Sequence, residues 1–310
     1  MDFKDFVTGK DDEGRRLDKV LKILVPTLNL SNLYKSLRKG LIKVNDKKAD
    51  PSYKICLNDK ISIATVLLGG TGNENDNKSQ KSNHDYSFIK NIIVFENEHF
   101  LFLNKPAGLS VQKADKNEPA LDDYVKTYLS DKEKTDSLSF RTGPLHRLDK
   151  NTCGLVCFSK SLAGAKWFSE QLQNNTIKKE YIGVVQGKLE QNMEWIDYIS
   201  NSKPGSKKEF QTVKVSDTPL PGAKKAITQV YPVETKIIDG NTISYVKFNI
   251  QTGRHHQIRA QSSYHGFPLI NDTAYNGQKT SFNNGNYYLC ACKLEFPQNE
   301  LGLPATLSLK

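Results

Sequence analysis

The segment His-Arg-Leu-Asp-Lys-Asn-Thr-Cys-Gly at 146–154 places one carboxylate, Asp149, among basic side chains. A strand-like run follows it, so we expect a loop at the end of a sheet, where functional side chains concentrate. A functional carboxylate there would act as a nucleophile or as a stabiliser of positive charge. The alternative is a purely structural role, in a turn in which Asp149 pairs with Arg147 or Lys150. The residues of this segment alone leave both interpretations open.

A second segment, Gln-Thr-Gly-Arg-His-His-Gln-Ile-Arg-Ala-Gln at 251–261, combines two arginines with two adjacent histidines. Adjacent histidines do not have the spacing of metal ligands, so we expect no metal site. A helix that begins at Arg254 would place Arg254 and Ile258 on one face and Arg259 beside His255. The alternative is an ordinary basic helix start near a turn.

Two further segments could contribute side chains to the same site. Tyr181 stands at the start of an alternating strand-like run within 175–187 and is either a core tyrosine or a residue of the cleft that holds Asp149. Lys105 lies in the turn Leu-Asn-Lys-Pro-Ala-Gly at 103–108. That turn either simply reverses the chain or brings backbone close to a ligand.

Several other chemistries find no support in the sequence. We find no Gly-x-Ser-x-Gly, no dinucleotide fingerprint after a strand and no His-Glu-x-x-His. Two cysteine pairs, Cys153 with Cys157 and Cys290 with Cys292, miss the usual spacing of zinc ligands and lie in apolar runs. We therefore expect structural cysteines, no metal and no cofactor.

The elements that must position these segments are mostly strands. Alternating apolar runs predict strands at 92–105, 154–160, 180–187, 226–234 and 243–253, and helical periodicity predicts helices at 121–130 and 161–173. These elements do not form a regular βαβ series. The sequence therefore predicts an α+β domain over 88–310, built on a mixed, mostly antiparallel sheet.

The first 66 residues predict a separate small α+β unit. Apolar residues at 17, 20, 21 and 24 have helical spacing, and a second helix is expected from an N-cap at Ser31 to a stop at Gly40. Strands with an Asn-Asp turn are expected at 41–50, and a further strand at 60–65. The Gly, Asn, Ser and Lys-rich stretch at 67–87 predicts a flexible linker.

Charge points to an anionic partner. The 310 residues include 44 Lys and Arg against 34 Asp and Glu, which gives a net charge of +10, and half of that excess lies in the first 70 residues. Nucleic acid is the first choice of partner and an acidic membrane surface the second. No apolar run is long enough for a membrane span, the N-terminus is no secretory signal, and five cysteines are an odd number. These features favour a reducing, cytoplasmic setting.

Four segments together resemble the RluA-type family of RNA pseudouridine synthases over residues 90–300. They are Leu-Asn-Lys-Pro-Ala-Gly-Leu-Ser-Val-Gln, His-Arg-Leu-Asp-Lys-Asn-Thr-Cys-Gly, Lys-Lys-Glu-Tyr-Ile-Gly-Val-Val and Thr-Gly-Arg-His-His-Gln-Ile-Arg. Residues 14–63 resemble an S4-type RNA-binding domain, as in the RluC and RluD branch, which acts on large-subunit ribosomal RNA. The resemblance implies a mixed sheet with a central RNA-binding cleft, no cofactor and a flipped-out target uridine. We expect a monomer that acts on ribosomal RNA, away from membranes.

The resemblance also implies roles for individual residues. The resemblance implies that the catalytic residues are Asp149, Tyr181 and Arg254, and that Arg254 keeps the Asp149 carboxylate ionised and oriented. Contacts with RNA or its base fall on His146, Arg147, Ile258, Lys105 and Arg259, with Arg147 replacing the flipped base. Phosphate contacts of the N-terminal unit fall on Arg16, Lys19, Lys35, Arg38 and Lys39. Departures from the family pattern at Cys153, His255, Ala260, Gln261 and Cys290 remove none of the catalytic residues.

Two other functions stay open at this level. The chain could be an RNA-binding or ribosome-assembly protein with an inactive synthase-like domain, although it keeps Asp149, Tyr181 and Arg254. It could also be a glycosidase that acts on nucleosides. That chemistry normally needs two carboxylates flanking the bond, and the motifs offer only Asp149.

Overall fold

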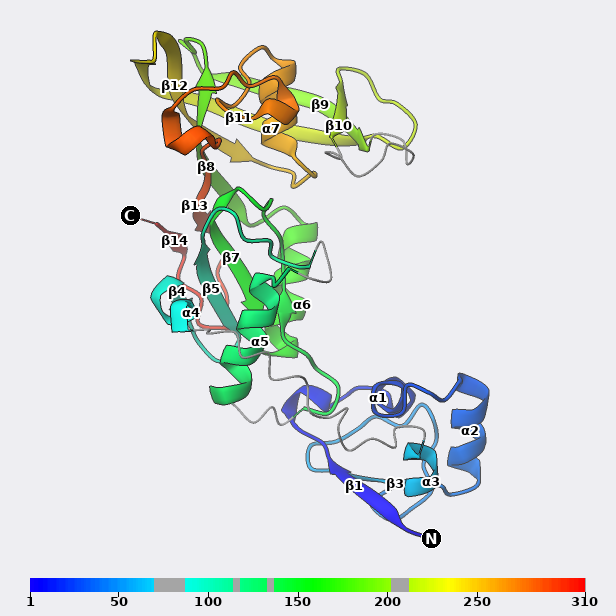
Figure 1. Ribbon diagram of the computed structural model, residues 1–310. Coiled ribbons are helices and arrows are strands. Elements are labelled where there is room, and N and C mark those ends of the chain that lie inside the picture. The colour runs from blue at the N-terminus through cyan, green and yellow to red at the C-terminus, as the bar shows by residue number, and fades with distance from the viewer. Residues whose placement is uncertain (70–86, 114–117, 133–136, 202–211, 310) are drawn as a thin grey trace.

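The computed structural model describes residues 1–69, 87–113, 118–132, 137–201 and 212–309 (Figure 1). The predicted linker therefore lies almost wholly outside the described residues. Before that gap the chain ends in the short helix α3 (Thr65–Leu68), and after it the chain resumes with α4 (Ser87–Ile92).

The N-terminal residues form a three-stranded antiparallel sheet with two helices beside it (Figure 1). The strand order is β1–β3–β2, with bounds β1 (Phe3–Val7), β2 (Ile42–Val44) and β3 (Lys60–Ala64). Helices α1 (Leu17–Leu24) and α2 (Leu30–Arg38) follow the short turn η1 (Lys10–Asp12). The helical apolar pattern buries Leu17, Val20 and Leu21 completely in a core of this unit. Burying each such side chain contributes about 1.5–3 kcal/mol.

Two local expectations in this unit need correction. The N-cap of α2 is Asn29, whose side chain accepts the Asn32 amide at 2.9 Å, so the helix begins before the expected cap Ser31. The Asn-Asp turn forms with positive φ, but its second strand is reduced to one bridge, between Val44 and Lys47. The sheet is completed instead by β1, which the sequence analysis did not predict.

The remaining strands form one large mixed sheet, as expected. Its order is β10–β9–β11–β12–β8–β13–β7–β5–β4, with β14 paired to β13 and β6 to β7. Among the described strands only β13 and β7 run parallel, and every other pairing is antiparallel. The bounds are β4 (Ile93–Glu96), β5 (Phe100–Lys105), β6 (Gly143–Pro144), β7 (Cys153–Ser159), β8 (Lys178–Gln186), β9 (Met193–Asn201), β10 (Val213–Ser216), β11 (Lys224–Ile238), β12 (Asn241–Ile250), β13 (Leu289–Glu295) and β14 (Thr306–Ser308).

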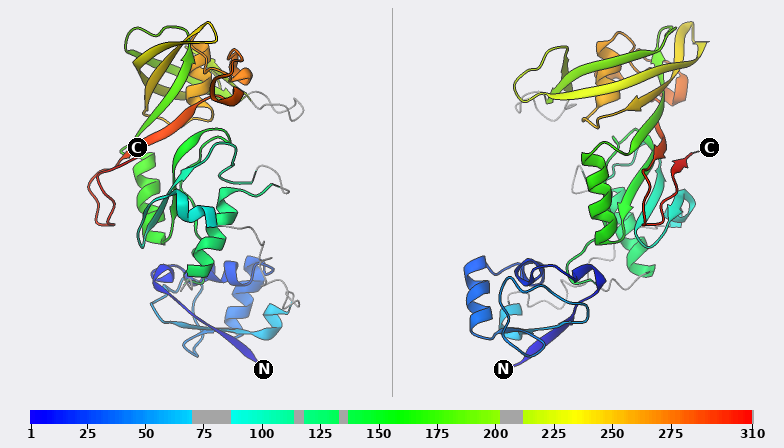
Figure 2. Two further views of the ribbon diagram at one scale, coloured as in Figure 1. Left: turned by 60° about the vertical axis from the view of Figure 1, so that its left-hand side comes forward. Right: turned by 180° about the vertical axis from the view of Figure 1, so that it is seen from behind.

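Strands β8 and β13 connect two halves of this sheet (Figures 1 and 2). One half carries β4, β5 and β7 with helices α5 (Leu121–Lys132) and α6 (Leu162–Gln173), which pack into two different hydrophobic clusters. The other half carries β9 to β12 with α7 (Gln257–Tyr264), η2 (Thr273–Tyr275) and η3 (Phe282–Gly285). The motifs of interest therefore come from both halves.

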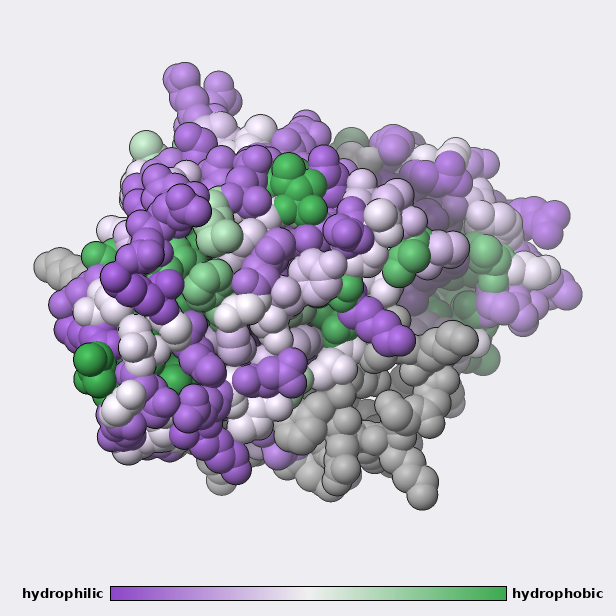
Figure 3. Space-filling view, turned by 90° about the horizontal axis from the view of Figure 1, so that it is seen from above, coloured by the Kyte–Doolittle hydropathy of each residue, from purple (hydrophilic) through white to green (hydrophobic). Residues whose placement is uncertain are grey.

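The outer surface is predominantly polar where Figure 3 displays it. Hydrophobic side chains on that face are scattered in small patches among hydrophilic ones. Within the described residues, no helix is both long and apolar enough to cross a membrane.

The N-terminal unit contacts the larger domain through Asp11, Arg15 and, most extensively, the buried carboxylate of Asp12. Asp12 is fully buried and accepts hydrogen bonds from the backbone of Gly9 at 3.0 Å, Leu138 at 2.8 Å and Ser139 at 3.0 Å. The hydroxyls of Ser137 and Ser139 also donate to it. Since Ser137 to Ser139 belong to the chain that follows α5, this carboxylate ties the two units together.

We expect Asp12→Ala to release the N-terminal unit. The change would leave the Leu138 and Ser139 amides buried without an acceptor, which costs about 1–3 kcal/mol each. Small-angle scattering should show a larger radius of gyration. Asp11→Ala is the matched control, because Asp11 accepts only the Leu162 amide across the junction, at 2.9 Å, and should keep the wild-type radius. An unchanged radius for Asp12→Ala would contradict this role.

The contact between the N-terminal unit and the larger domain should also depend on pH. Burial alone would raise the pKa of Asp12, but hydrogen bonds from Ser139, Leu138, Gly9 and Ser137 outweigh burial and lower it. The ionised carboxylate therefore stabilises docking above the ordinary aspartate pKa of about 3.9. This contribution is lost as the pH falls through the lower pKa of the folded protein. Scattering should show an unchanged radius at pH 5 and expansion only below a pH of about 4.

Candidate active site

The segment that carries Asp149 is a loop between β6 and β7, as predicted. Leu148 is buried in the cluster that α5 covers, whereas Arg147 on one side is exposed and Asp149 on the other is partly exposed. The Thr152 amide donates to the Asp149 carbonyl at 3.1 Å and closes a turn. One buried leucine therefore anchors the loop, and its two charged neighbours face outward.

Lys105 is hydrogen-bonded to this loop through the Lys150 carbonyl. Its ammonium is fully buried and donates to the carbonyls of Pro106 and Leu109, both at 2.8 Å, and of Lys150 at 3.0 Å. Burial lowers its pKa to about 8, against the opposing effects of Cys153 and Asp149. An RNA contact does not fit this position, so that expectation is corrected. Lys105 instead joins two turns next to Asp149.

The second motif folds differently from the expected helix at Arg254. Helix α7 begins at Gln257, and His256 before it adopts a left-handed backbone with φ of +52°. The Gln257 side chain accepts the Arg254 amide at 3.0 Å and thereby fixes the turn. Arg254 therefore stands outside the helix, partly exposed, and its Nε donates to the Lys225 carbonyl at 2.8 Å.

Arg259, on α7, is the arginine that reaches Asp149. The two atoms Nη1 of Arg259 and Oδ2 of Asp149 are 3.2 Å apart. The rest of the guanidinium forms a fork with Asp272, with Nε to Oδ2 at 2.7 Å and Nη2 to Oδ1 at 2.9 Å. This geometry corrects the expected pairing of Asp149 with Arg254, because the later helix start turns Arg259 inward.

The Arg259 guanidinium is enclosed on all sides. Arg259 is 8 % exposed and Asp272 only 2 %. The rings of Tyr275 and Tyr287 lie 5.0 and 4.8 Å from the guanidinium carbon, at cation–π distance. Burial alone would lower the pKa of Arg259, but Asp272, Tyr287 and Asp149 raise it. A fixed positive charge is thus presented to the Asp149 carboxylate.

Two imidazoles border the same carboxylate. His256 Nε2 lies 3.6 Å from Asp149 Oδ2, and His256 Nδ1 lies 2.8 Å from the Tyr275 hydroxyl. The ring of His255 stacks on the ring of His256, with 3.8 Å between the ring centroids. Burial lowers the pKa of His256 to about 4, although Asp149 opposes the change, so His256 is neutral at pH 7. The possible metal-ligand atoms of Asp149, His255 and His256 lie within 4.8 Å of one another. The positive charge beside Asp149 in this structure comes from Arg259.

Tyr181, on β8, adjoins Asp149. Burial, followed by the charge of Asp149, raises the pKa of Tyr181, so its phenol stays protonated. It packs against the cluster that contains Ile258, which is itself buried. The side chain of His146 does not face RNA as expected. It accepts the Cys157 amide at 3.1 Å and stacks on Phe168, and burial lowers its pKa to about 4.

The basic residues predicted for the N-terminal unit are all exposed: Arg16, Lys19, Lys35, Arg38 and Lys39. The last three lie on or directly after α2. Arg16 forms a two-pronged bond with Asp18 at 3.2 and 2.8 Å, and the Tyr34 hydroxyl donates to the same carboxylate at 3.1 Å. This network fixes the start of α1 beside the exposed charges of α2.

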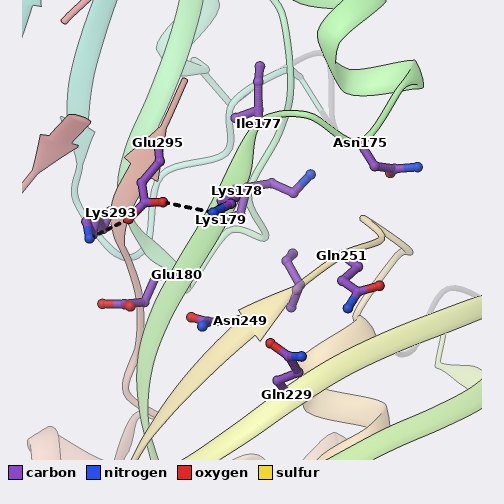
Figure 4. Close-up of a pocket in the computed structure, with 11 residues that line it drawn as sticks. Asn175, Ile177, Lys178, Lys179, Glu180, Gln229, Asn249, Gln251, Lys293 and Glu295 are labelled. Atoms are coloured by element: carbon purple, nitrogen blue, oxygen red, sulfur yellow. Dashed lines mark ion pairs between the residues drawn. The ribbon is translucent and has the colours of Figure 1, made fainter. Parts of the chain in front are cut away.

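A separate cavity of about 410 Å³ opens between the end of α6 and the sheet (Figure 4). Glu295 pairs there with Lys293 at 2.6 Å and with Lys178 at 3.7 Å, and the amides of Gln229 and Asn249 form another wall. None of the predicted site residues lines it. The candidate active site is therefore the Asp149 cluster and not this cavity.

Sequence reasoning missed Asp272, Tyr275, Tyr287 and the position of His256 in this cluster. Asp272 stands in the segment Gly-Phe-Pro-Leu-Ile-Asn-Asp-Thr at 266–273, to which the sequence analysis assigned no role. No spacing links it to Arg259, thirteen residues earlier on the helix. Only the fold brings this carboxylate to the guanidinium.

Comparisons with known proteins show what this chain is similar to. The family model "RNA pseudouridylate synthase" matches residues 99–264, and the S4 domain model matches residues 15–61. An "Uncharacterized RNA pseudouridine synthase" of Mycoplasma capricolum is 29% identical over 301 residues, covering 94% of this chain and 91% of the relative. A "Ribosomal large subunit pseudouridine synthase C" of Buchnera aphidicola is 28% identical over 279 residues, covering 88% and 81%.

Solved structures show the same fold. "Human RNA Pseudouridylate Synthase Domain Containing 4" superposes with a TM-score of 0.57 at 18% identity, covering 73% of this chain and 90% of that one. "Human RNA Pseudouridylate Synthase Domain Containing 1" gives a TM-score of 0.52 at 19% identity, covering 67% and 79%.

Proposed function

Because this chain belongs to the RNA pseudouridylate synthase family, whose members are isomerases, we propose a site and a substrate for that isomerisation. Asp149 acts on the target nucleotide, and the substrate is large-subunit ribosomal RNA. The observation that carries the proposal is the contact between Asp149 and Arg259, at 3.2 Å, with Arg259 itself held by the buried Asp272.

The reaction explains why such a carboxylate is needed. The N1–C1′ bond of uridine breaks, the uracil turns, and a C5–C1′ bond forms. The C5 proton then leaves to solvent and N1 takes up a proton, so that the product is an isomer of uridine. An ionised carboxylate near C1′ can attack that carbon or stabilise its positive character. The fork between Arg259 and Asp272 supports this role, because a fixed guanidinium orients the Asp149 carboxylate through a charge-assisted hydrogen bond.

Neighbouring side chains fit the remaining steps. A uridine in a stacked helix must leave the stack to reach a carboxylate. Arg147 is exposed next to Asp149, so its planar guanidinium is suited to fill the vacated position. The protonated phenol of Tyr181 can pack on the uracil and donate a hydrogen bond. Its raised pKa disfavours the phenolate that removal of the C5 proton by Tyr181 would require.

The substrate class rests on the named relatives and on the N-terminal unit. The Buchnera aphidicola relative is named for the large ribosomal subunit. The exposed cations of α2 suit phosphate contacts, which give affinity with little sequence information. Incubation with C5-tritiated transcripts of large-subunit RNA, small-subunit RNA and transfer RNA tests the proposal. We expect tritium release from the first alone. Release only from the others contradicts the substrate, and free uracil contradicts isomerisation.

The α2 cations should set the salt dependence of RNA binding. We expect the triple variant Lys35→Gln, Arg38→Gln, Lys39→Gln to reduce the slope of log affinity against log salt by about 2, since each lost phosphate contact removes about 0.7–0.9. Fluorescence anisotropy at several salt concentrations measures it, with Lys166→Gln, an exposed lysine on α6, as a control. An unchanged slope for the triple variant would leave α2 outside the RNA interface.

The proposal extends to assembly and location. We propose that the enzyme acts as a monomer, with Arg259 and His256 of the same chain beside Asp149. Ribosomal RNA of bacteria such as Buchnera aphidicola lies in the cytoplasm, where we place the enzyme. Light scattering at working concentration should give the mass of one chain, 34.9 kDa, and a stable dimer would contradict the monomer.

A further inference from the structure

Two thiols face each other where strands β7 and β13 run parallel. Cys153 at the start of β7 and Cys290 in β13 are register partners on these two strands. The strands come unusually close here. Gly154, with φ of +112°, lies against the backbone of Ala291, and any Cβ at this position would overlap it. The fold thus brings together two cysteines that are far apart in sequence.

The two thiols differ in a way that suits stepwise oxidation. Cys153 is partly exposed, whereas Cys290 is 8 % exposed. The hydrogen bond from Cys290, aided by the Lys105 ammonium and opposed by burial, lowers the pKa of Cys153 to about 7. The same hydrogen bond, together with burial, raises the pKa of Cys290. Cys153 is therefore the more readily ionised of the two thiols and the better nucleophile.

The other cysteines lack this combination. Cys157 is completely buried, and burial raises its pKa well above the usual value. Burial and the charge of Glu180 raise the pKa of Cys292 to about 11. Cys56 is exposed and belongs to the N-terminal unit, not to the strand pair β7 and β13. All five thiols are free in the structure.

We propose that Cys153 and Cys290 form a redox-active dithiol that a hydroperoxide oxidises to an intramolecular disulfide. The Cys153 thiolate attacks one peroxide oxygen, the O–O bond breaks, and Cys153 becomes a sulfenic acid while the other oxygen leaves as hydroxide. Cys290 then attacks the Cys153 sulfur, and the sulfenic hydroxyl leaves as water. In total two thiols and hydrogen peroxide give one disulfide and two waters. The sulfurs lose two electrons and the peroxide gains them.

The position of this pair connects it to the proposed active site. Cys153 follows Thr152, which closes the turn with Asp149. Cys290 is near enough to Tyr181 to affect the pKa of that phenol. The dithiol therefore lies between the loop of Asp149 and the strand of Tyr181, and the test of its oxidation needs no RNA.

Peptide mapping of the full-length protein tests the proposal. The reduced protein is treated with hydrogen peroxide, blocked with a thiol reagent and digested with trypsin without reductant. We expect a linked pair of peptides, 151–160 and 280–293, with fragmentation assigning the bond to Cys153 and Cys290. Dithiothreitol should restore both thiols. Dominant linkage through Cys157 or Cys292, or loss of Cys56 alone, overturns the proposal.

Single variants separate the two steps. Cys290→Ala should stop at the first step, so that dimedone labels a sulfenic acid at Cys153. Cys153→Ser should abolish both the disulfide and the dimedone adduct in this region. Cys157→Ala is the matched control on the same strand and should form the disulfide within about twofold of the wild-type rate. Absence of dimedone labelling in a folded Cys290→Ala protein, judged by its circular dichroism, also overturns the proposal.

Discussion

Asp149→Asn should abolish tritium release from C5-labelled RNA, with a loss of about 10⁴-fold or more. Asparagine has nearly the shape of aspartate, but it lacks the charge that would attack or stabilise C1′. Arg259 keeps its fork to Asp272 in this variant, so the site should stay folded. RNA affinity should remain within about tenfold of the wild type, because most of it comes from phosphate contacts elsewhere.

The adjacent Lys150→Gln variant is the matched control. Lys150 lies on the same loop, but only its carbonyl is used by Lys105, and its exposed ammonium pairs with Glu118 at 2.8 Å. Its activity should stay within about threefold of the wild type, as expected for a surface ion pair. Persistent tritium release by Asp149→Asn, at a rate near that of Lys150→Gln, would remove Asp149 from the mechanism.

The loop of Asp149 could be predicted from sequence because its determinants are local. A buried leucine between two charged residues, followed by an apolar strand, predicts a partly exposed carboxylate at a sheet end. The mostly antiparallel sheet was likewise predictable from alternating runs. Strands β9, β10 and β14 were missed, since their patterns are short or interrupted.

The choice between Arg254 and Arg259 could not be made from sequence. It depends on where α7 begins, and that start is set by the left-handed backbone of His256 and by the side chain of Gln257. Because Arg254 precedes that start, it lies in the turn and bonds to the Lys225 carbonyl, whereas Arg259 lies within the helix and reaches Asp149. Lys105 was misjudged for a related reason: three carbonyls converge on it only after the chain has folded.

Arg259→Lys should lower kcat by about 10²–10³-fold, the loss expected when one fixed electrostatic contact is removed. A lysine has one ammonium and cannot bind Asp272 with two prongs while also reaching Asp149. Arg254→Lys is the matched control, since Arg254 lies in the same motif but binds the Lys225 carbonyl instead. Its kcat should stay within about threefold of the wild type, because only the carboxylate contact is catalytic. Equal losses in both variants would contradict the assignment of Arg259.

Asp272 is a positioning residue, and its effect should appear only through Arg259. Asp272→Asn leaves the buried guanidinium without its charged partner, so kcat should fall by about 10²-fold while the RNA dissociation constant changes little. If the two residues act as one unit, the double variant Arg259→Lys, Asp272→Asn should be no slower than Arg259→Lys alone, within about threefold. Multiplying losses in the double variant, or a fall in RNA affinity equal to that in kcat, would mean that Asp272 supports the fold and does not position Arg259 against Asp149.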